Sequence, residues 1–258
     1  MTSSEDGTVD LAIDGAVATI TINRPKVRNS INIATAKRLV EIVMEIEETP
    51  AVRVAILTGA GNVAFSAGAD MRARAAGEPR ATFPPYGFAG FVRRPRTKPY
   101  IAAVNGYAFG GGLELAMACE LVVASPSATF ALPEPLRGLV AGGDCLPLAL
   151  SRLPAAVAWD VALTGRRIEA KEALACGMIN GISDDVMQAA RELAGKIAMC
   201  APKAVGATMQ LMRALLQKGP DGYDDLVEKT QAGLSRSRDA AEGAAAFLEK
   251  REPVWSGS

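Results

Sequence analysis

Two glutamates with apolar neighbours are the residues of this sequence best suited to chemistry. Glu114 stands in the stretch GLELAM, in the first turn of an expected helix, and Glu134 stands in FALPEP. Removing a carboxylate from water raises its pKa toward the working range of a general acid or base. Two such groups could hold one water molecule and deliver its proton and its hydroxide to one substrate.

Each glutamate taken alone also has an ordinary structural explanation. Glu114 could complement the positive end of a helix macrodipole. Glu134 could be a loop carboxylate exposed to water, since charged residues are seldom fully buried. Both explanations stay open for the single residues, whereas the pair in similar surroundings favours acid/base catalysis.

The sequence contains no histidine. Ser-His-Asp and Cys-His nucleophile systems are therefore excluded, as are zinc sites that need imidazole. Acid/base chemistry near neutral pH must then come from carboxylates, Cys, Lys or Tyr. The sequence predicts no metal site.

Two glycine-rich turns follow expected strands and could expose backbone N–H groups. The turn at 59–64 (GAGNVA) matches a dinucleotide-binding pattern, but the FSAGAD that follows interrupts the helix such a site needs. The glycines at 110–112 lack the GK[ST] of a phosphate-binding loop. Without Cβ atoms in the way, two N–H groups could converge on one substrate oxygen as an oxyanion hole. The alternative is that these glycines only permit tight turns.

Alternating strands and helices are expected to position these groups. Short apolar runs predict strands at 17–22, 52–57, 100–104 and 121–123, with an extended stretch at 130–132. Apolar residues at helical spacing predict helices at 33–48, 113–119, 169–175, 185–199, 202–217 and 223–249. The Pro-, Gly- and Arg-rich stretch 77–99 is expected to be a long loop. Strands that alternate with helices predict a mostly parallel α/β fold.

The order of these elements predicts two parts. Residues 1–195 are expected to form an α/β core, and residues 196–258 a C-terminal helical part suited to oligomerisation. With 258 residues, of which 49% are hydrophobic, the chain can bury a sizeable core.

Composition argues against nucleic-acid and membrane partners. Lys+Arg and Asp+Glu balance at 28 each, and the run RRPR at 93–96 is the only dense basic cluster. No apolar stretch reaches the about 20 residues that cross a bilayer, and the N-terminus lacks the pattern of a signal peptide. The four cysteines show no CxxC spacing, so we expect reduced thiols in a cytoplasmic protein.

The stretch IAAVNGYAFGGGLELA at 101–116 resembles the signature of the enoyl-CoA hydratase/isomerase (crotonase) family. Further similar segments follow the same order along nearly the whole chain, at 23–25, 65–70, 132–134, 163–167 and 247–251. The resemblance implies a crotonase-like spiral of ββα units with a C-terminal helical trimerisation part. It also implies a homotrimer, and trimers in this family commonly pair into hexamers.

The resemblance also implies roles for individual residues. The N–H groups of Ala69 and Gly111 would hold the thioester oxygen, while Glu114 and Glu134 would be the catalytic carboxylates, with Glu134 serving the α-carbon proton. Polarising the thioester carbonyl would stabilise the enolate that develops during addition or elimination. The positions that match the CoA contacts of the family are Lys26, Val27, Ala67, Asp70, Met71, Arg72, Phe247 and Lys250.

The implied reaction is the reversible addition of water to 2-enoyl-CoA thioesters, with coenzyme A as part of the substrate and no further cofactor. A carnitine-type acyl group is one option and an ordinary short acyl chain is another. An enoyl-CoA isomerase is the enzymatic alternative, because it would need only Glu134. A catalytically weak acyl-CoA-binding scaffold is the alternative outside enzymes.

The stretch AGGDCLPL at 141–148 departs from the family pattern. It replaces the usual Pro-Gly-x-Gly-Gly and a following Arg-Leu, so that the glycine pair of the family falls at Asp144 and Cys145 unless the register slips to 142–143. Asp144 is expected to cap the helix after Gly143, because Asp is a preferred N-cap. Alternatively, Asp144 lies near the acyl terminus. There it would favour a cationic acyl group together with aromatic residues of the 77–99 loop, which are Phe83, Tyr86, Phe88 and Phe91.

Overall fold

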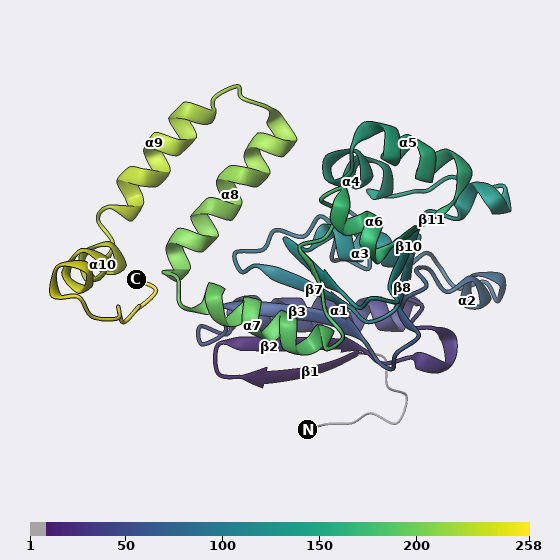
Figure 1. The fold of residues 1–258 in the computed structure, drawn as a ribbon, viewed down its shortest axis with the longest axis horizontal. Helices are drawn as coiled ribbons and strands as arrows, with labels where there is room; N and C mark the ends of the chain where they lie inside the picture. The colour runs from purple at the N-terminus through teal and green to yellow at the C-terminus, as the bar shows by residue number, and fades with distance from the viewer. Residues whose placement is uncertain (1–8) are drawn as a thin grey trace.

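A computed structural model describes residues 9–258. Its larger sheet has six strands in the order β1-β2-β3-β7-β9-β12. These strands are Val9–Asp14, Val17–Ile22, Val54–Gly59, Tyr100–Val104, Leu121–Ala124 and Gly181–Ile182. Only the β1–β2 hairpin is antiparallel, and the other neighbours are parallel (Figure 1). The mostly parallel sheet confirms the prediction.

A second sheet of four strands has the order β11-β10-β8-β4. Its strands are Arg167–Glu169, Thr129–Ala131, Tyr107–Phe109 and Ala64–Ser66. Three times the chain adds a strand to the larger sheet, then one to the smaller sheet, and then forms a helix. These helices are α2 (Met71–Ala75), α3 (Gly111–Ala118) and α4 (Cys145–Arg152). This repeated ββα path confirms the predicted spiral.

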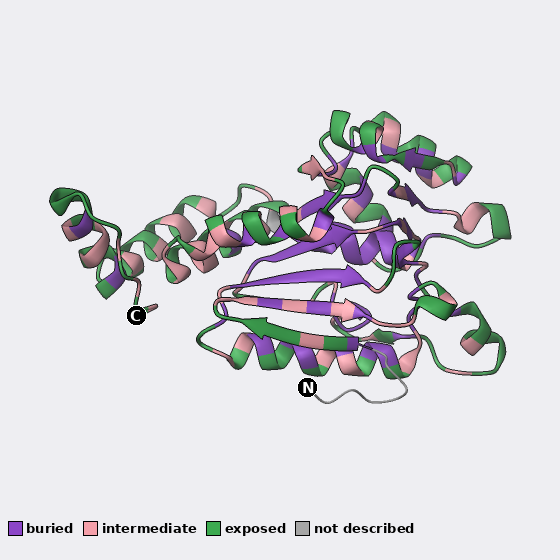
Figure 2. Cartoon of the chain, turned by 60° about the horizontal axis from the view of Figure 1, so that its bottom comes forward, coloured by how far each residue is buried: buried purple, intermediate pink, exposed green. Residues whose placement is uncertain are grey.

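Helices cover both faces of the larger sheet. Alternate residues of β3 face opposite sides, so Ala55 and Leu57 belong to the large core that also holds α1 (Ile33–Glu48), while Val54 and Ile56 pack with α7 (Val186–Ala198). Every residue of β3 and β7 is buried, as expected for a parallel strand covered on both faces (Figure 2). The apolar runs that predicted these strands therefore reflect burial on two sides.

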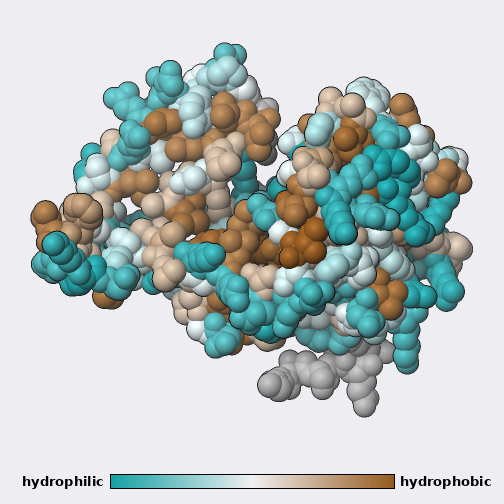
Figure 3. Space-filling view, in the orientation of Figure 1, coloured by the Kyte–Doolittle hydropathy of each residue, from teal (hydrophilic) through white to brown (hydrophobic). Residues whose placement is uncertain are grey.

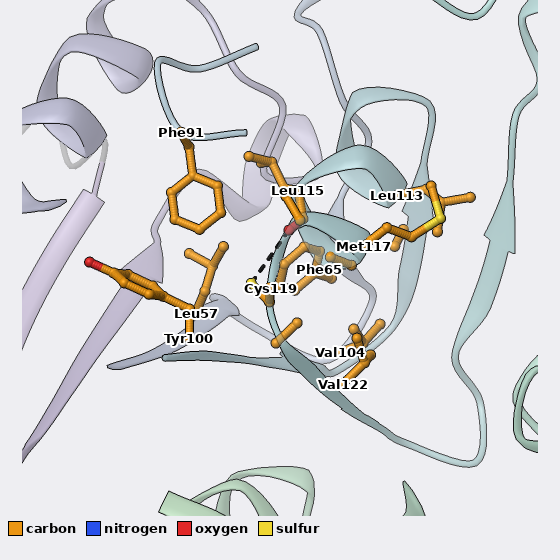
Figure 4. Packing of buried hydrophobic residues seen from close by; sticks show 14 of the residues in the cluster. Leu57, Phe65, Phe91, Tyr100, Val104, Leu113, Leu115, Met117, Cys119 and Val122 are labelled. Atoms are coloured by element: carbon orange, nitrogen blue, oxygen red, sulfur yellow. Dashed lines mark hydrogen bonds between the residues drawn. The ribbon is translucent and has the colours of Figure 1, made fainter. Parts of the chain in front are cut away.

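The core between the two sheets carries the helix that bears Glu114. Leu113, Leu115 and Met117 of α3 pack among side chains of both sheets, including Phe65 and Val104 (Figure 4). The stretch is apolar all round because α3 is surrounded by protein.

Three further helices form a C-terminal part that projects to one side of the core (Figure 1). They are α8 (Pro202–Lys218), α9 (Tyr223–Leu234) and α10 (Arg238–Glu249). Arg213 of α8 donates to the carbonyl of Arg96 at 2.8 Å, and Arg53 of the core donates to the carbonyls of Ala198 and Trp255 at 2.9 and 3.2 Å. These bonds fix the C-terminal part against the core.

Several local predictions were wrong. The single helix expected at 223–249 is two helices, because Ser237 accepts a hydrogen bond from Ala240 N–H and caps a new helix there. The loop expected at 77–99 contains a small hairpin, β5 (Thr82–Phe83) and β6 (Gly87–Phe88). Strands β1, β4, β8, β11 and β12 and helices α2 and α5 (Ala155–Thr164) were not predicted.

Two expectations about membranes and export have different outcomes. Among the helices of residues 9–258, none is long and apolar enough to cross a membrane. The prediction that the N-terminus lacks the pattern of a signal peptide concerns residues 1–8, which lie outside the described residues.

A glycine at the start of α3 provides a test of this packing. A Cβ atom on Gly112 would lie 2.0 Å from the carbonyl oxygen of Ser66, so Gly112→Ala should destabilise the fold by about 3 kcal/mol or more. Gly195→Ala in α7 is the matched control, because nothing lies within 4 Å of its Cβ position and Ala should stabilise the helix by up to about 1 kcal/mol. Urea unfolding of both variants measures the difference. Equal effects of the two substitutions would contradict this packing.

Candidate active site

Glu114 is a buried carboxylate at the start of α3, with 3% of its surface exposed. Its backbone N–H donates to the carbonyl of Gly110, and Gly110 itself has a φ of +54°, where a side chain would be strained. A Cβ atom on Gly110 would also lie 2.6 Å from Glu134 Oε1. The glycine-rich turn therefore brings the two glutamates to the same junction.

The N-terminus of α4 holds both oxygens of Glu114. The N–H of Asp144 donates to Oε1 at 2.8 Å, and the thiol of Cys145 lies 3.4 Å from Oε2 as a donor. Gly143 has a φ of +61°, and a Cβ atom there would lie 2.5 Å from Oε1. The turn at 143–145 thus fits closely around this carboxylate.

Glu134 lies in the first turn of a short 3-10 helix (Glu134–Arg137) that follows β10. Among the residues that the structure describes, its buried Oε2 has no hydrogen-bond partner. An unpartnered buried oxygen is costly unless a ligand or water satisfies it. Glu134 is therefore the carboxylate that is free to interact with a bound molecule.

Burial changes the acidity of both carboxylates in the same direction. Burial raises the pKa of Glu114 to about 7, although the hydrogen bonds from Asp144 N–H and Cys145 oppose the change. Burial also raises the pKa of Glu134. Burial, followed by the charges of Glu114 and Glu134, raises the pKa of the Cys145 thiol. Carboxyl groups whose pKa is raised in this way are better suited to hold and exchange a proton than exposed ones.

Two backbone N–H groups lie beside this pair. Ile31 donates to Gly68 O at 2.8 Å, and the C=O of Gly68 and the N–H of Ala69 point in opposite directions across one trans peptide. The N–H of Ala69 therefore points away from Ile31, on an exposed residue. A Cβ atom on Gly68 would lie 2.7 Å from the nitrogen of Gly111, so this turn lies against the start of α3.

Within residues 9–258, neither Ala69 N–H nor Gly111 N–H donates a hydrogen bond. Gly111 is the first residue of α3, where an N–H has no partner inside the helix and the macrodipole is positive. These two donors are suited to bind a ligand oxygen.

Asp70, one of the predicted CoA contacts, has a structural role. Its carboxylate accepts from Arg24 at 2.9 Å and from the N–H groups of Arg72 and Ala73 at 3.1 Å, which caps α2. Although burial acts in the opposite direction, the bonds from Ala73 and Arg24 hold the pKa of Asp70 below its usual value. Asp70 thereby fixes the exposed side chains of Met71 and Arg72 at the edge of the site.

The other predicted CoA contacts fall into two groups. Lys26, Val27 and Ala67 lie on adjacent segments, because Ala67 N–H donates to Arg28 O at 3.0 Å. Phe247 and Lys250 belong to the end of α10, at the opposite end of the molecule from α2 (Figure 1). The fold of one chain therefore does not bring these two residues to the candidate site.

The aromatic residues of the 77–99 segment have different surroundings. The ring of Phe88 packs on Gly111, where a Cβ atom would lie 2.5 Å from Phe88 Cε1. Phe91 is fully buried, with Tyr100 at 5.4 Å and Arg96 at 4.2 Å from its ring. Arg94 covers the ring of Tyr86 at 4.1 Å. Phe88 thus lies next to Gly111 at the start of α3, whereas Phe91 lies in the core.

The predicted capping role of Asp144 was wrong. Helix α4 begins at Cys145, as expected, but the side chain of Asp144 makes no capping hydrogen bond. Its two oxygens instead accept from Arg93 Nε at 2.8 and 2.7 Å. A charge-assisted bond of this kind is stronger than a bond to a neutral backbone N–H.

Cys145 and Arg93 were not among the predicted site residues. In the register that places the glycine pair of the family at Asp144 and Cys145, a side chain replaces a glycine at Cys145, and this departure was the available signal. No feature of the sequence indicated that Arg93 would pair with Asp144.

Comparison with known proteins identifies the class to which this fold and site belong. A model described as enoyl-CoA hydratase/isomerase matches residues 12–258, and the chain belongs to this family. Carnitinyl-CoA dehydratases of Proteus mirabilis and Salmonella typhimurium are each 42% identical to it over 255 residues, which is 96% of this chain and 97% of theirs.

Solved structures agree with this assignment. An enoyl-CoA hydratase from Mycobacterium tuberculosis superposes with a TM-score of 0.93 at 39% identity, over 98% of this chain and 100% of the other. A carnitinyl-CoA hydratase from Mycobacterium avium superposes with a TM-score of 0.79 at 39% identity, over 98% and 99%. The predicted crotonase-like fold is confirmed.

The raised pKa of Glu114 predicts how stability depends on pH. Between pH 4.5 and about 7, the folded chain binds a proton at Glu114 that the unfolded chain has lost. The free energy of unfolding should therefore fall as the pH rises through this window, by up to about 3 kcal/mol. Glu114→Gln has no proton to lose at this position, so its free energy of unfolding should not fall for this reason. Its stability relative to wild type should therefore increase with pH. Urea unfolding at several pH values measures it, and a constant difference between the two proteins would contradict it.

Proposed function

We propose that this chain is a hydro-lyase that reversibly adds water to 2-enoyl-CoA thioesters. The observation that carries the proposal is the meeting of two carboxylates of raised pKa with two backbone N–H groups at one helix junction. Such a site can move protons at neutral pH and stabilise an anionic oxygen at the same time.

The N–H groups of Ala69 and Gly111 bind the thioester oxygen. Their bonds strengthen as negative charge develops on that oxygen, so they stabilise the enolate more than the substrate. The positive end of α3 contributes in the same direction. Phe88, packed on Gly111, limits the space available to water and to the acyl group on that side.

The two carboxylates divide the proton transfers. Glu114, as the carboxylate, removes a proton from water while the water oxygen forms its bond to the β-carbon. Glu134, in its acid form, donates its proton to the α-carbon of the enolate. A proton then passes from Glu114 to Glu134 before the next turnover, and the reverse sequence is dehydration.

Retention of Glu114 favours hydration over isomerisation. An isomerase moves one proton and needs one carboxylate. In this chain a second carboxylate, that of Glu114, is buried and accepts hydrogen bonds from two donors. Burying a charged group costs free energy, which favours a catalytic role for it. The same observation argues against a scaffold that has lost catalysis.

A carnitine-type acyl group is the proposed substrate class within this reaction. It is supported by the 42% identity to proteins named carnitinyl-CoA dehydratase. The carboxylate of Asp144 is compensated by Arg93, so a trimethylammonium group would have to share it with that guanidinium. Selectivity for a cationic acyl group is therefore expected to be moderate.

A homotrimer or hexamer completes the CoA site in this proposal. The side chain of Phe247 is 83% exposed at the far end of the chain, and with Lys250 it would reach the CoA bound to a neighbouring copy. Hydrophobic surface extends over the C-terminal helices (Figure 3), and its exposed side chains include Met212, Leu216 and Leu248. The free cysteines among the described residues agree with a cytoplasmic enzyme of acyl-CoA metabolism.

The carboxylate roles can be tested by kinetics. Glu114→Gln and Glu134→Gln should each lower the hydration rate at least about a hundredfold, because each removes a positioned acid or base. Loss of the enoyl absorbance should be followed for crotonyl-CoA and crotonobetainyl-CoA. Hydration near the wild-type rate in either variant would overturn the mechanism, and Glu114→Gln that keeps isomerase activity alone would favour the isomerase.

The oligomer can be tested in solution. The chain should be a trimer or hexamer by light scattering at micromolar concentration, and Phe247→Ala should keep that size. If Phe247 stacks on the base of CoA, its loss should raise KM at least about fivefold, since such stacking is worth about 1–3 kcal/mol. A monomeric wild-type chain, or an unchanged KM in the variant, would contradict the shared site.

A further inference from the structure

Cys145 places a thiol inside the candidate active site. It is the first residue of α4, with 2% of its surface exposed. Its sulfur lies 3.4 Å from Glu114 Oε2 and 3.9 Å from Gly110 O. A thiol has one proton to donate, and a charged carboxylate at the shorter distance is the better acceptor.

This thiol is a donor and not a nucleophile. Burial, together with the charges of Glu114 and Glu134, raises the pKa of Cys145 far above its ordinary value. A thiol that stays protonated neither attacks a thioester nor forms a disulfide readily. Its remaining capacity is to donate a hydrogen bond.

Cys145 and Asp144 act on the same carboxylate from adjacent positions. The N–H of Asp144 binds Oε1 and the S–H of Cys145 binds Oε2, so any rotation of the carboxylate breaks both bonds. The side chain of Asp144 is in turn held by Arg93. The start of α4 therefore holds the carboxylate of Glu114 by two hydrogen bonds, one to each oxygen.

We infer that Cys145 is a positioning residue, whose thiol fixes the carboxylate of Glu114 so that it acts as the base toward water. Glu134, whose Oε2 has no partner among the described residues, then carries the α-carbon proton. The inference rests on the proposed function for the meaning of these two roles. In this inference the segment at 143–145, where the chain departs from the family pattern, determines which carboxylate acts on water and which acts on the α-carbon.

The charged and titratable groups around Glu114 are few. Asp144, Arg93 and Cys145 act on it directly. Among residues 9–258, the elements packed against α3 also carry Tyr100, Tyr107 and Arg152. Glu134 approaches Gly110, just before α3. Of these groups, only the thiol of Cys145 and the N–H of Asp144 donate hydrogen bonds to Glu114.

The pH profile of hydration provides the first test. In Cys145→Ala the carboxylate of Glu114 loses a donor, so the acidic limb of kcat/KM should move to higher pH by about half a unit to one unit. On the acidic side this is a loss of about three- to tenfold, since one unit is one factor of ten. KM should change less than twofold, because the CoA contacts lie elsewhere. Cys145→Ser keeps a donor and should restore the wild-type limb or move it to lower pH.

Cys119→Ala is the matched control. Cys119 is also a buried thiol at α3, but it donates to the carbonyl of Leu115 at 3.4 Å (Figure 4). Its loss should lower stability and leave the pH profile in place. If Cys119→Ala moves the acidic limb as far as Cys145→Ala does, or if Cys145→Ala does not move it, the inference is overturned.

A spectroscopic test does not depend on activity. The S–H stretching band of Cys145, identified by its loss in Cys145→Ala, should shift when Glu114→Gln removes the charged acceptor. A band that does not shift would overturn the inference even if hydration is observed. If the band shifts but the chain hydrates no enoyl-CoA, the contact between Cys145 and Glu114 is supported and the proposed function is contradicted.

Discussion

The burial of one carboxylate, Glu114, is the constraint on which the rest of the site depends. A buried carboxylate needs donors, and α3 itself supplies none to the side chain because its neighbours are glycine and aliphatic residues. The donors come from the start of α4, a segment about thirty residues away in the sequence. The hydrogen bonds of Glu114 in one ββα unit therefore depend on the position of the next unit, which ends in α4.

The spiral explains why such a meeting is possible. Each unit ends a strand of the smaller sheet and starts a helix near the corresponding junction of the next unit. Close approach of Gly68 to Gly111 and of Gly112 to Ser66 removes the space that side chains would need. The same close approach places the backbone of Gly68 and Ala69 next to Gly111 at the start of α3. The tight packing and the binding capacity of the site therefore have one origin.

The C-terminal helical part follows a different principle. It contributes few residues to the core, and Arg53 and Arg213 hold it through bonds to backbone carbonyls. Its apolar side chains remain exposed in a single chain. A rigidly held helical part with an exposed apolar surface suits association between copies, and it would carry Phe247 toward the site of a neighbour.

The sequence by itself determined the elements with strong local patterns, and it singled out two glutamates as candidate catalytic groups. The strands at 17–22 and 100–104 and the helix at 33–48 were predicted with their observed bounds, because burial imposes a regular apolar pattern. Glu114 and Glu134 were singled out as candidates because they interrupt such patterns. Only the tertiary structure decided that Asp144 pairs with Arg93 instead of capping α4 and that Cys145 binds Glu114. These contacts join segments far apart in the chain, and no local pattern encodes which distant partner a side chain will meet.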